Sequence, residues 1–414
     1  MQTRALRDLG QRAETELRSD ILPFWLTHAI DRHNGGFYGR IANDLTIVRR
    51  ADKGLALNAR ILSTFSRVLR VYGDEVYRRT ADRAYAYLMS HFRDGAHGGF
   101  FSAVDPEGRV VDTSKRACAQ ASCIHALAEY HLATGDPTAL SEAVRTYEFL
   151  ESFARDTMSG GYFEIVERSA APTESPDVAS SKRDESKSIT THLSVLDGYT
   201  NLVHAWGSAE LRGRVREVLR IFLDRILHPS KRHLRLLFDE SWKPRSDRVS
   251  FGHDLEVSWL LVDAAEVANA PSLLAEVQAG AVHLAEAALM EGVDADGGIL
   301  SEAGPSGPVD GDKLWWSQAE AVVGFLGAFE LTRRAPLLEA AMRTWGFIER
   351  AVLDRDHGEW FAKVSPSGEP NRGAFKVDES KCPYHGTRAC LEIMARTERM
   401  TSRAQLPGPV GRRV

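Results

Sequence analysis

A motif of glycines followed by aromatic residues returns along this chain at nearly constant intervals. It reads GGFY at 35–38, GGFF at 98–101 and GGYF at 160–163, so the spacings are 63 and 62 residues. GGIL at 297–300 follows 137 residues later, about two periods, and GEWF at 358–361 comes about one period after that. A regular period of this length indicates that the chain stacks one structural unit repeatedly.

The unfilled position of the repeat falls at 233–238 (HLRLLF), which makes six units and nearly exhausts the 414 residues. Between the motifs, apolar residues recur at spacings of three and four, the pattern of an amphipathic helix. Ala117 to Thr134 has no internal glycine or proline, and the stop signal Gly135-Asp136-Pro137 follows it. The other helical stretches are 193–206, 253–268, 319–332 and 388–396.

Each unit is therefore predicted to be a helix, a short Gly-aromatic loop or hairpin, and a second helix. One such pair cannot bury its apolar faces alone, so neighbouring units must stack. Six pairs can close into an all-α (α/α)6 barrel, which removes the exposed end units of an open array. We expect a single barrel domain over 1–400 and a disordered tail over 401–414. The Ser-, Pro- and Ala-rich stretch 169–182 is expected to be loosely held beside the barrel mouth.

The composition narrows the class of partner. The 57 acidic and 52 basic residues give a net charge of −5, which does not favour nucleic acid or an anionic membrane and suits a neutral small molecule. No apolar run approaches the ~20 residues of a membrane span, and the charged N-terminus lacks the apolar core of a signal peptide.

Four cysteines are too sparse for a disulfide framework, so free thiols in a reducing cytoplasm are expected. We expect a monomer or a homodimer.

Three segments carry polar and aromatic residues at the starts of predicted helices. In 250–259 (SFGHDLEVSW), His253 and Glu256 are three residues apart and so share one helix face. In the second segment, Trp316 lies one turn before Glu320. A flat indole stacks on the C–H faces of a sugar, while a carboxylate accepts hydrogen bonds from its hydroxyls. Each pattern also fits a structural role, as a core histidine with a capping carboxylate or as an aromatic core position.

The third segment places His385 near a helix start, just after Pro383. Alone, a histidine of this kind is more often structural than catalytic. The three helix starts recur about one period apart, at 253, 316 and 385, and equivalent positions in a barrel of repeats gather at one end. The segments are therefore predicted to converge on one pocket, with two histidines on opposite sides of it to remove and return a proton.

The chain resembles the N-acylglucosamine 2-epimerase superfamily, and most closely its cellobiose 2-epimerase and mannose 2-epimerase branch. The matching stretches, in the order of the family, are NGGFYGRI at 34–41, LNARIL at 57–62, HLRLLFDESW at 233–242, SFGHDLEVSWLL at 250–261, WWSQAEAVVGF at 315–325 and KCPYHGTRAC at 381–390. They extend over nearly the whole chain. The family fold is an (α/α)6 barrel, in agreement with the repeat count.

The resemblance also implies roles for individual residues. His253 and His385 match the two acid/base histidines, and Glu256 joins them in the catalytic set. Arg60 matches the arginine that holds the substrate near its reactive end, and Trp316 matches a sugar-stacking tryptophan. The remaining substrate-binding positions that the resemblance implies are Tyr38, His192, Ser194, Trp259 and Glu320.

Three positions depart from the family pattern. Where the family commonly has Asn-x-His-x-His, this chain has Thr190 and Ser194 in the first and last places and keeps His192. Where disaccharide epimerases carry a tryptophan before Lys-Cys-Pro-Tyr-His, this chain has Ser380. Loss of that stacking platform weakens the case for a disaccharide and favours a monosaccharide such as mannose.

We therefore predict a cofactor-independent 2-epimerase that opens an aldose, removes its C2 proton through a histidine and reprotonates the enediolate on the other face. Aldose–ketose isomerisation needs nearly the same groups, and a sugar-binding relative without activity is another alternative. A glycoside hydrolase would use Glu256 and Glu320 as acid and base but would leave the two histidines without a task. The sequence has no HExxH, EF-hand or GxGxxG pattern, so neither a metal nor a nucleotide cofactor is expected.

Overall fold

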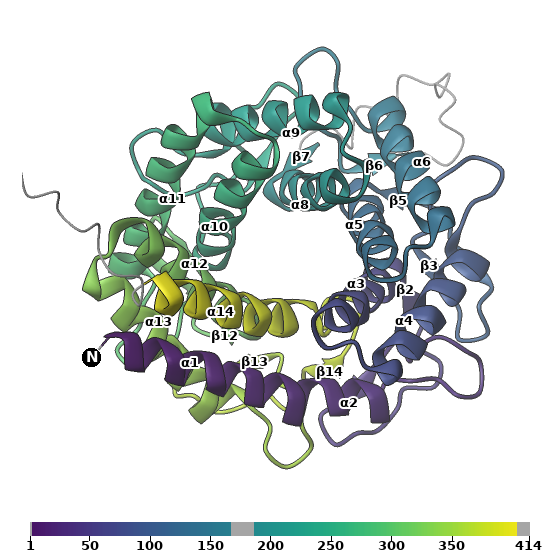
Figure 1. Ribbon diagram of the computed structural model, residues 1–414, viewed down its shortest axis with the longest axis horizontal. Coiled ribbons are helices and arrows are strands. Elements are labelled where there is room, and N and C mark those ends of the chain that lie inside the picture. Colours follow the sequence, from purple (N-terminus) through teal and green to yellow (C-terminus); the bar gives the residue numbers. More distant parts are fainter. Residues whose placement is uncertain (1, 167–185, 404–414) are drawn as a thin grey trace, which may run out of the picture.

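The computed structural model describes residues 2–166 and 186–403, and within them the helices form two concentric rings (Figure 1). The inner ring consists of α3 (Leu55–Tyr72), α5 (Ala117–Thr134), α8 (Ile189–Trp206), α10 (Phe251–Val267), α12 (Trp315–Thr332) and α14 (Tyr384–Arg403). The outer ring consists of α1 (Gln2–Glu16), α4 (Glu75–Tyr87), α6 (Pro137–Phe153), α9 (Ala209–Ile221), α11 (Pro271–Glu291) and α13 (Ala335–Phe347). Each inner helix packs against the next, and α14 packs against α3. The ring is closed, and the predicted (α/α)6 barrel is confirmed.

The helix boundaries follow local sequence signals. Helix α5 has the predicted bounds, and the other predicted inner helices begin a few residues earlier, at the polar and aromatic residues of their first turn. Helices α3, α5 and α8 end at Gly73, Gly135 and Gly207, whose left-handed conformation closes a helix without steric cost. Helix α14 continues to Arg403, beyond the expected domain end at 400. The rest of the expected tail and the stretch 169–182 lie outside the described residues.

The Gly-aromatic loop forms the same local structure in each unit. Gly35 and Gly36 adopt positive φ angles of 82° and 62°, which only glycine adopts without strain, and the residue that follows pairs with the chain leaving the preceding outer helix. The six such bridges in the described residues are Ile30 with Phe37, Arg93 with Phe100, Arg155 with Tyr162, Leu227 with Leu234, Val293 with Ile299 and Leu353 with Trp360. Leu234 fills the fourth position, so the unit predicted at 233–238 is confirmed.

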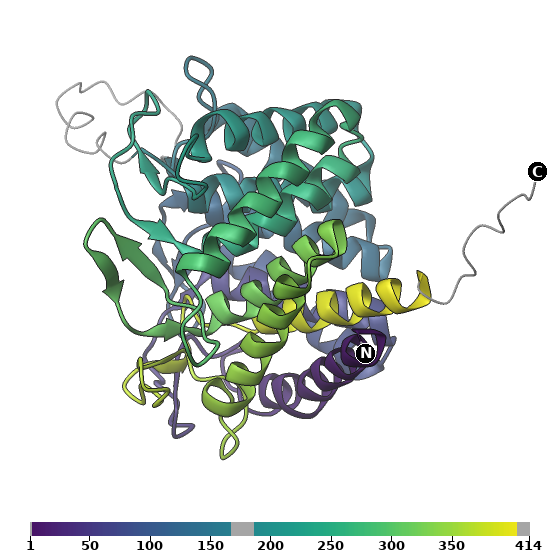
Figure 2. The same cartoon turned by 90° about the vertical axis from the view of Figure 1, so that its left-hand side faces the viewer.

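Short antiparallel strands join neighbouring units at one end of the barrel (Figure 2). The sheets are β1 (Ile41–Ala42) with β14 (Phe375–Val377); β2 (Lys53–Gly54), β3 (Ala103–Val104) and β4 (Val110–Asp112); β5 (Lys115–Arg116) with β6 (Ile165–Val166); β7 (Lys187–Ser188) with β8 (Leu237–Phe238); β9 (Val249–Ser250), β10 (Glu302–Gly304) and β11 (Gly307–Asp310); and β12 (Lys313–Leu314) with β13 (Lys363–Val364). An inner helix starts directly after each of β2, β5, β7, β9 and β12. The first turns of the inner helices therefore meet at this end.

Buried ion pairs hold the Gly-aromatic loops in place. Lys53 Nζ lies 2.9 Å from Asp31 and also donates to the carbonyl of Gly35 at 2.8 Å. The equivalent lysine–aspartate pairs are Lys115 with Asp94, Lys187 with Asp156 and Lys376 with Asp354. Since removal of one member leaves an unpaired buried charge, breaking such a pair costs about 3–5 kcal/mol of folding stability.

The outer helices vary more than the inner ones. Four of them continue into a turn of π-helix, namely η1 (Leu17–Ile21), which leads into α2 (Leu22–Thr27), η2 (Leu88–Phe92), η3 (Phe222–Ile226) and η4 (Ile348–Val352). Helix α11, with 21 residues, is the one helix in the described part of the chain that matches a membrane span by length and composition, although no such run was expected from the sequence. It packs against α10 and α12 as part of the outer ring.

Candidate active site

The starts of the inner helices surround a cavity of about 170 Å³, called the central cavity below. It is lined by Arg60, Ser63, Ser122, His125, Thr190, Leu193, Ser194, Asp197, His253, Glu256, Trp315, Trp316, Ser380, Tyr384 and His385. The predicted site residues in this lining are Arg60, Ser194, His253, Glu256, Trp316 and His385. The three segments expected to converge from distant parts of the sequence are thus brought together.

Two repeated helix positions supply most of the polar lining. The sixth residues of α3, α5, α8, α10 and α12 are Arg60, Ser122, Ser194, Glu256 and Glu320, in that order. The ninth residue lies three further on and so on the same helix face. In the first three of these helices the ninth residues are Ser63, His125 and Asp197.

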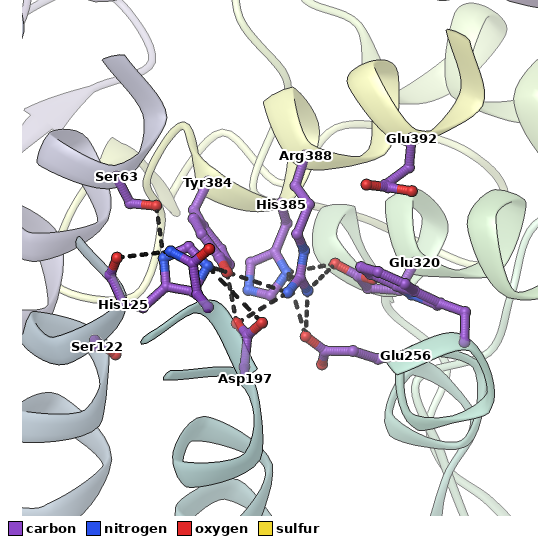
Figure 3. Close-up of polar contacts among 12 residues, drawn as sticks. Ser63, Ser122, His125, Asp197, Glu256, Glu320, Tyr384, His385, Arg388 and Glu392 are labelled. Carbon is purple, nitrogen blue, oxygen red and sulfur yellow. Dashed lines mark hydrogen bonds and ion pairs between the residues drawn. The ribbon is translucent and has the colours of Figure 1, made fainter. Parts of the chain in front are cut away.

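A buried carboxylate holds His385 (Figure 3). The Nδ1 atom of His385 lies 2.7 Å from Oε1 of Glu320, and Nε1–H of Trp259 donates to Oε2 of Glu320 at 3.1 Å. An ionised carboxylate only accepts, so this contact favours the ring proton on Nδ1 and leaves Nε2 as the basic nitrogen. Burial lowers the pKa of His385 well below 6.5 although the charge of Glu256 opposes the shift, so the ring is neutral at pH 7.

The indole of Trp316 lies next to both predicted histidines. Its ring centroid is 4.8 Å from that of His253 and 5.8 Å from that of His385. Nδ1 of His253 hydrogen bonds with Oγ of Ser250 at 2.9 Å, and burial lowers the pKa of His253. Both histidines therefore lie next to the same indole at the central cavity. The expectation that they lie on opposite sides of the pocket stays a prediction.

Arg388 joins carboxylates from three helices. Its guanidinium donates to Oε1 of Glu256 and, at 2.6 Å, to Oε1 of Glu320, and its other terminal nitrogen lies 3.3 Å from Oδ2 of Asp197. Ligand atoms of Glu256, Glu320 and His385 lie within 4.8 Å of one another, a spacing that a metal ion could bridge. Because Arg388 already bonds to both glutamates, a divalent cation would have to displace its guanidinium.

His125 and Asp197 form the floor of the central cavity and were not predicted from the sequence. Oγ of Ser63 bonds with Nδ1 of His125 at 2.9 Å, while Nε2 of His125 faces Oδ1 of Asp197 at 3.9 Å. The hydroxyl of Tyr384 donates to Oδ2 of Asp197 at 2.6 Å. Burial would raise the pKa of Asp197, but His125 and Arg388 outweigh it, so that pKa lies below its usual range and the carboxylate is charged.

His192 holds a loop and is not among the described residues that line the central cavity, and its substrate-binding role stays a prediction. Its Nε2 accepts from the N–H of Tyr162 at 3.0 Å, and its Nδ1 hydrogen bonds with the carbonyl of Ser188 at 2.7 Å. Gln120 and Gln318, also the fourth residues of their helices, bond in the same way to their own Gly-aromatic loops. Both ring nitrogens of His192 are thus used, and burial lowers its pKa to about 4.

Three other predicted binding residues lie outside the lining. Glu320 and Trp259 are buried behind His385 and act on it through the hydrogen bonds given above. Tyr38 is half-buried, packs against the hydrophobic core and is not among the described residues that line the central cavity. Its substrate-binding role stays a prediction.

The three departures from the family pattern all face the central cavity. Thr190, Ser194 and Ser380 belong to its lining. Ser380 lies at an exposed position, where its hydroxyl bonds with Oδ1 of Asp378 at 2.8 Å. The differences that separate this chain from its family pattern are thus concentrated where a ligand would bind.

Comparison with known proteins gives matches along nearly the whole chain. Residues 36–389 match the family model of N-acylglucosamine 2-epimerase (GlcNAc 2-epimerase). A cellobiose 2-epimerase of Bacteroides fragilis is 40% identical over 389 residues, which cover 93% of this chain and 98% of that protein.

Solved structures show the same architecture. The cellobiose 2-epimerase of Bacillus thermoamylovorans superposes with a TM-score of 0.88 at 31% identity, covering 94% of this chain and all of that one, 100%. A D-mannose isomerase superposes with a TM-score of 0.81 over 93% of this chain and 97% of that one, but at 17% identity this likeness shows the fold alone.

Proposed function

Because the chain belongs to the N-acylglucosamine 2-epimerase family, we propose that it is a carbohydrate 2-epimerase, an isomerase that inverts C2 at the reducing end of an aldose without a cofactor. The observation that carries this proposal is the placement of His253 and His385 next to the same indole, that of Trp316, at the central cavity. Both histidines have lowered pKa values and are neutral at pH 7, so either can accept a proton from carbon.

The proposed reaction begins with the open-chain aldehyde, because only this form acidifies the C2 proton. Nε2 of His385 accepts that proton, and the electron pair left on C2 forms an enediolate with the carbonyl. Arg60, a permanent cation in the lining, stabilises the negative oxygen. After rotation about C2–C3, His253 takes up a proton from solvent and delivers it to the opposite face of C2, while His385 releases the proton that it removed. Removal and return of one proton leave the composition of the sugar unchanged, so no redox cofactor is required.

We propose a mannose- or glucose-type ring as the substrate. The central cavity of about 170 Å³ is smaller than the roughly 300–1,000 Å³ of sites that enclose drug-sized ligands, so it suits one sugar ring. The serine at position 380 provides no stacking surface for a second ring. The four cysteines are free thiols, and three of them are buried, which supports a reducing cytoplasm as the proposed location.

Aldose–ketose isomerisation is the second candidate, because His253 and His385 both lie next to the indole of Trp316. Either ring could return to C1 the proton that is removed from C2. The chemistry up to the enediolate is shared by the two reactions. Only the carbon that is reprotonated distinguishes them.

The first test is an incubation of the purified protein with mannose, glucose, fructose, cellobiose and N-acetylmannosamine, followed by NMR of the products. We expect a C2 epimer from mannose or glucose, loss of this activity in His385→Asn, and full activity in His283→Asn, a matched change on the outer helix α11. EDTA should leave the rate unchanged. Binding of these sugars without turnover would instead identify a sugar-binding relative.

A further inference from the structure

Two of the residues that line the central cavity above its floor are small, and the floor residues His125 and Asp197 also line a second cavity of about 1100 Å³. The sixth residues of α5 and α8 are Ser122 and Ser194, whereas α3 and α10 carry Arg60 and Glu256 at this position. The serines leave the ninth-residue layer below them open to the cavity. His125 and Asp197 in that layer therefore belong to the cavity lining (Figure 3).

Nε2 of His125 lies 3.5 Å from the Tyr384 hydroxyl, beyond the usual length of an N–H···O hydrogen bond, and faces a carboxylate oxygen of Asp197 across a gap. The 3.9 Å between Nε2 of His125 and Oδ1 of Asp197 exceeds the 2.7–3.2 Å of a direct hydrogen bond. Two hydrogen bonds of ~2.8 Å that meet at roughly a right angle on a shared oxygen span this distance. The gap therefore has the size of one hydroxyl group.

The hydrogen bonds around the gap determine whether a hydroxyl bound there must donate, accept or do both. Burial lowers the pKa of His125 more than Asp197 raises it, so the ring is neutral and carries one N–H. The Ser63 hydroxyl can donate to Nδ1, and the carboxylate opposite favours the proton on Nε2. Tyr384 and Arg388 hold Oδ2 of Asp197, and so fix the carboxylate without using Oδ1. The gap thus presents one donor and one acceptor, the pair that a sugar hydroxyl satisfies.

The floor lies apart from the reacting groups. The ring of Tyr384 lies between the two histidines, with its centroid 5.7 Å from that of His125 and 5.4 Å from that of His385. A sugar whose C2 is beside His385 would reach the floor with its other end. The hydroxyl in the gap is then one borne by C4, C5 or C6, away from the carbon that exchanges its proton.

We propose that His125 and Asp197 bind a hydroxyl at the far end of the substrate and make this chain selective for the sugar that bears it. The proposal rests on the proposed epimerase function and adds a specificity site to it. A site built to bond a buried hydroxyl rejects the analogue that lacks it, because both partner groups are then left unpaired. His125 is thus assigned to substrate binding, apart from the carbon atoms that react.

The test combines substitutions in the protein with removal of single hydroxyl groups from the substrate. The kcat/KM of wild type, His125→Leu and His125→Gln is measured with mannose, 4-deoxymannose and 6-deoxymannose, with His283→Leu as the matched exposed control. We expect wild type to lose about 10- to 100-fold on one deoxy sugar, and His125→Leu to lose a similar factor on mannose, mainly through KM. On that deoxy sugar wild type and His125→Leu should agree within about threefold, and His125→Gln should recover part of the loss on mannose.

Equal losses of His125→Leu on all three sugars, or no loss on mannose, would overturn the proposal. Circular dichroism and thermal unfolding establish that each variant is folded. If wild type binds mannose but does not turn it over, the proposed function is contradicted. The specificity site is then tested by measuring Kd for the same variants and the same three sugars. If wild type neither binds nor converts mannose, both proposals are contradicted.

Discussion

Nδ1 of His385 and Oε1 of Glu320 are 2.7 Å apart, in a part of the barrel where both side chains are buried. Since Trp259 donates to the other oxygen of Glu320, the carboxylate has a fixed orientation. This contact favours Nε2 as the basic nitrogen of His385, and it links the proposed chemistry of α14 to a residue of α12.

Glu320→Gln is expected to lower kcat by about 10²-fold or more with a smaller change in KM. The amide can donate to Nδ1 and so place the ring proton on Nε2, the wrong nitrogen for a base. The measurement is initial-rate kinetics on mannose, with Glu276→Gln on the exposed face of α11 as the matched control. An unchanged kcat would show that Glu320 does not orient the base.

The pH dependence of kcat/KM follows from the lowered pKa values of His385 and His253. A base must be neutral, and burial disfavours the protonated ring, so each base keeps its function at pH values below the ordinary 6.5. We expect a constant kcat/KM from pH 6.5 to 8 and an acidic decline that lies entirely below pH 6.5. A decline centred at or above pH 6.5, in protein that circular dichroism shows to be folded, would contradict this assignment.

His192→Gln is expected to retain activity and to reduce the acid sensitivity of the fold. The pKa of His192 is lowered to about 4, so between pH 6.5 and 4 the unfolded state binds a proton that the native state does not. The native state therefore loses stability as pH falls through this window, by about 2 kcal/mol at pH 5. Glutamine is the residue that bonds the equivalent loop at Gln120 and Gln318, and it does not titrate.

The check for His192→Gln is urea unfolding at pH 7.5 and pH 5.0. The difference in unfolding free energy between these two pH values should be smaller in the variant by about 2 kcal/mol. His192→Ala, which leaves the N–H of Tyr162 without its acceptor, should cost about 1–3 kcal/mol at both pH values. A large loss of kcat/KM in His192→Gln would place this residue in the substrate-binding set.

Ser380→Trp is expected to raise kcat/KM on cellobiose relative to mannose by about tenfold. Ser380 is exposed at the lining of the central cavity, and an indole there would provide a stacking surface for a second sugar ring. Ser367→Trp, on an exposed loop before β14, is the matched control. An equal effect on both sugars would show that position 380 does not select chain length.

Much of the fold follows from the sequence because the repeat is visible in it. Glycine is favoured at the positive φ angles of these loops, which keeps the motif recognisable in five units. The fourth unit has Arg232 at a positive φ angle and no glycine before Leu234, so its spacing alone identifies it in the sequence. The convergence of His253, Trp316 and His385 follows from the same repeat, since equivalent positions in a closed ring must lie at one end.

The positions of His125 and Asp197 at the floor of the central cavity, and of His192 beside its loop, were found only from the three-dimensional structure. His125 and Asp197 lie in stretches with the apolar spacing of core helices, and only alignment of the inner helices on the repeat puts them one turn below the sixth-residue layer. The same alignment places His192 at the fourth position with Gln120, where side chains bond the loops.

The most direct test of the proposed reaction is the position of solvent deuterium in the product. Mannose is incubated with the protein in D2O, and NMR determines which carbon of the product carries deuterium. We expect glucose labelled at C2, formed at a rate that is lowered by at least about 10²-fold in His385→Asn. Fructose labelled only at C1 would contradict C2 epimerisation and would establish the isomerase instead.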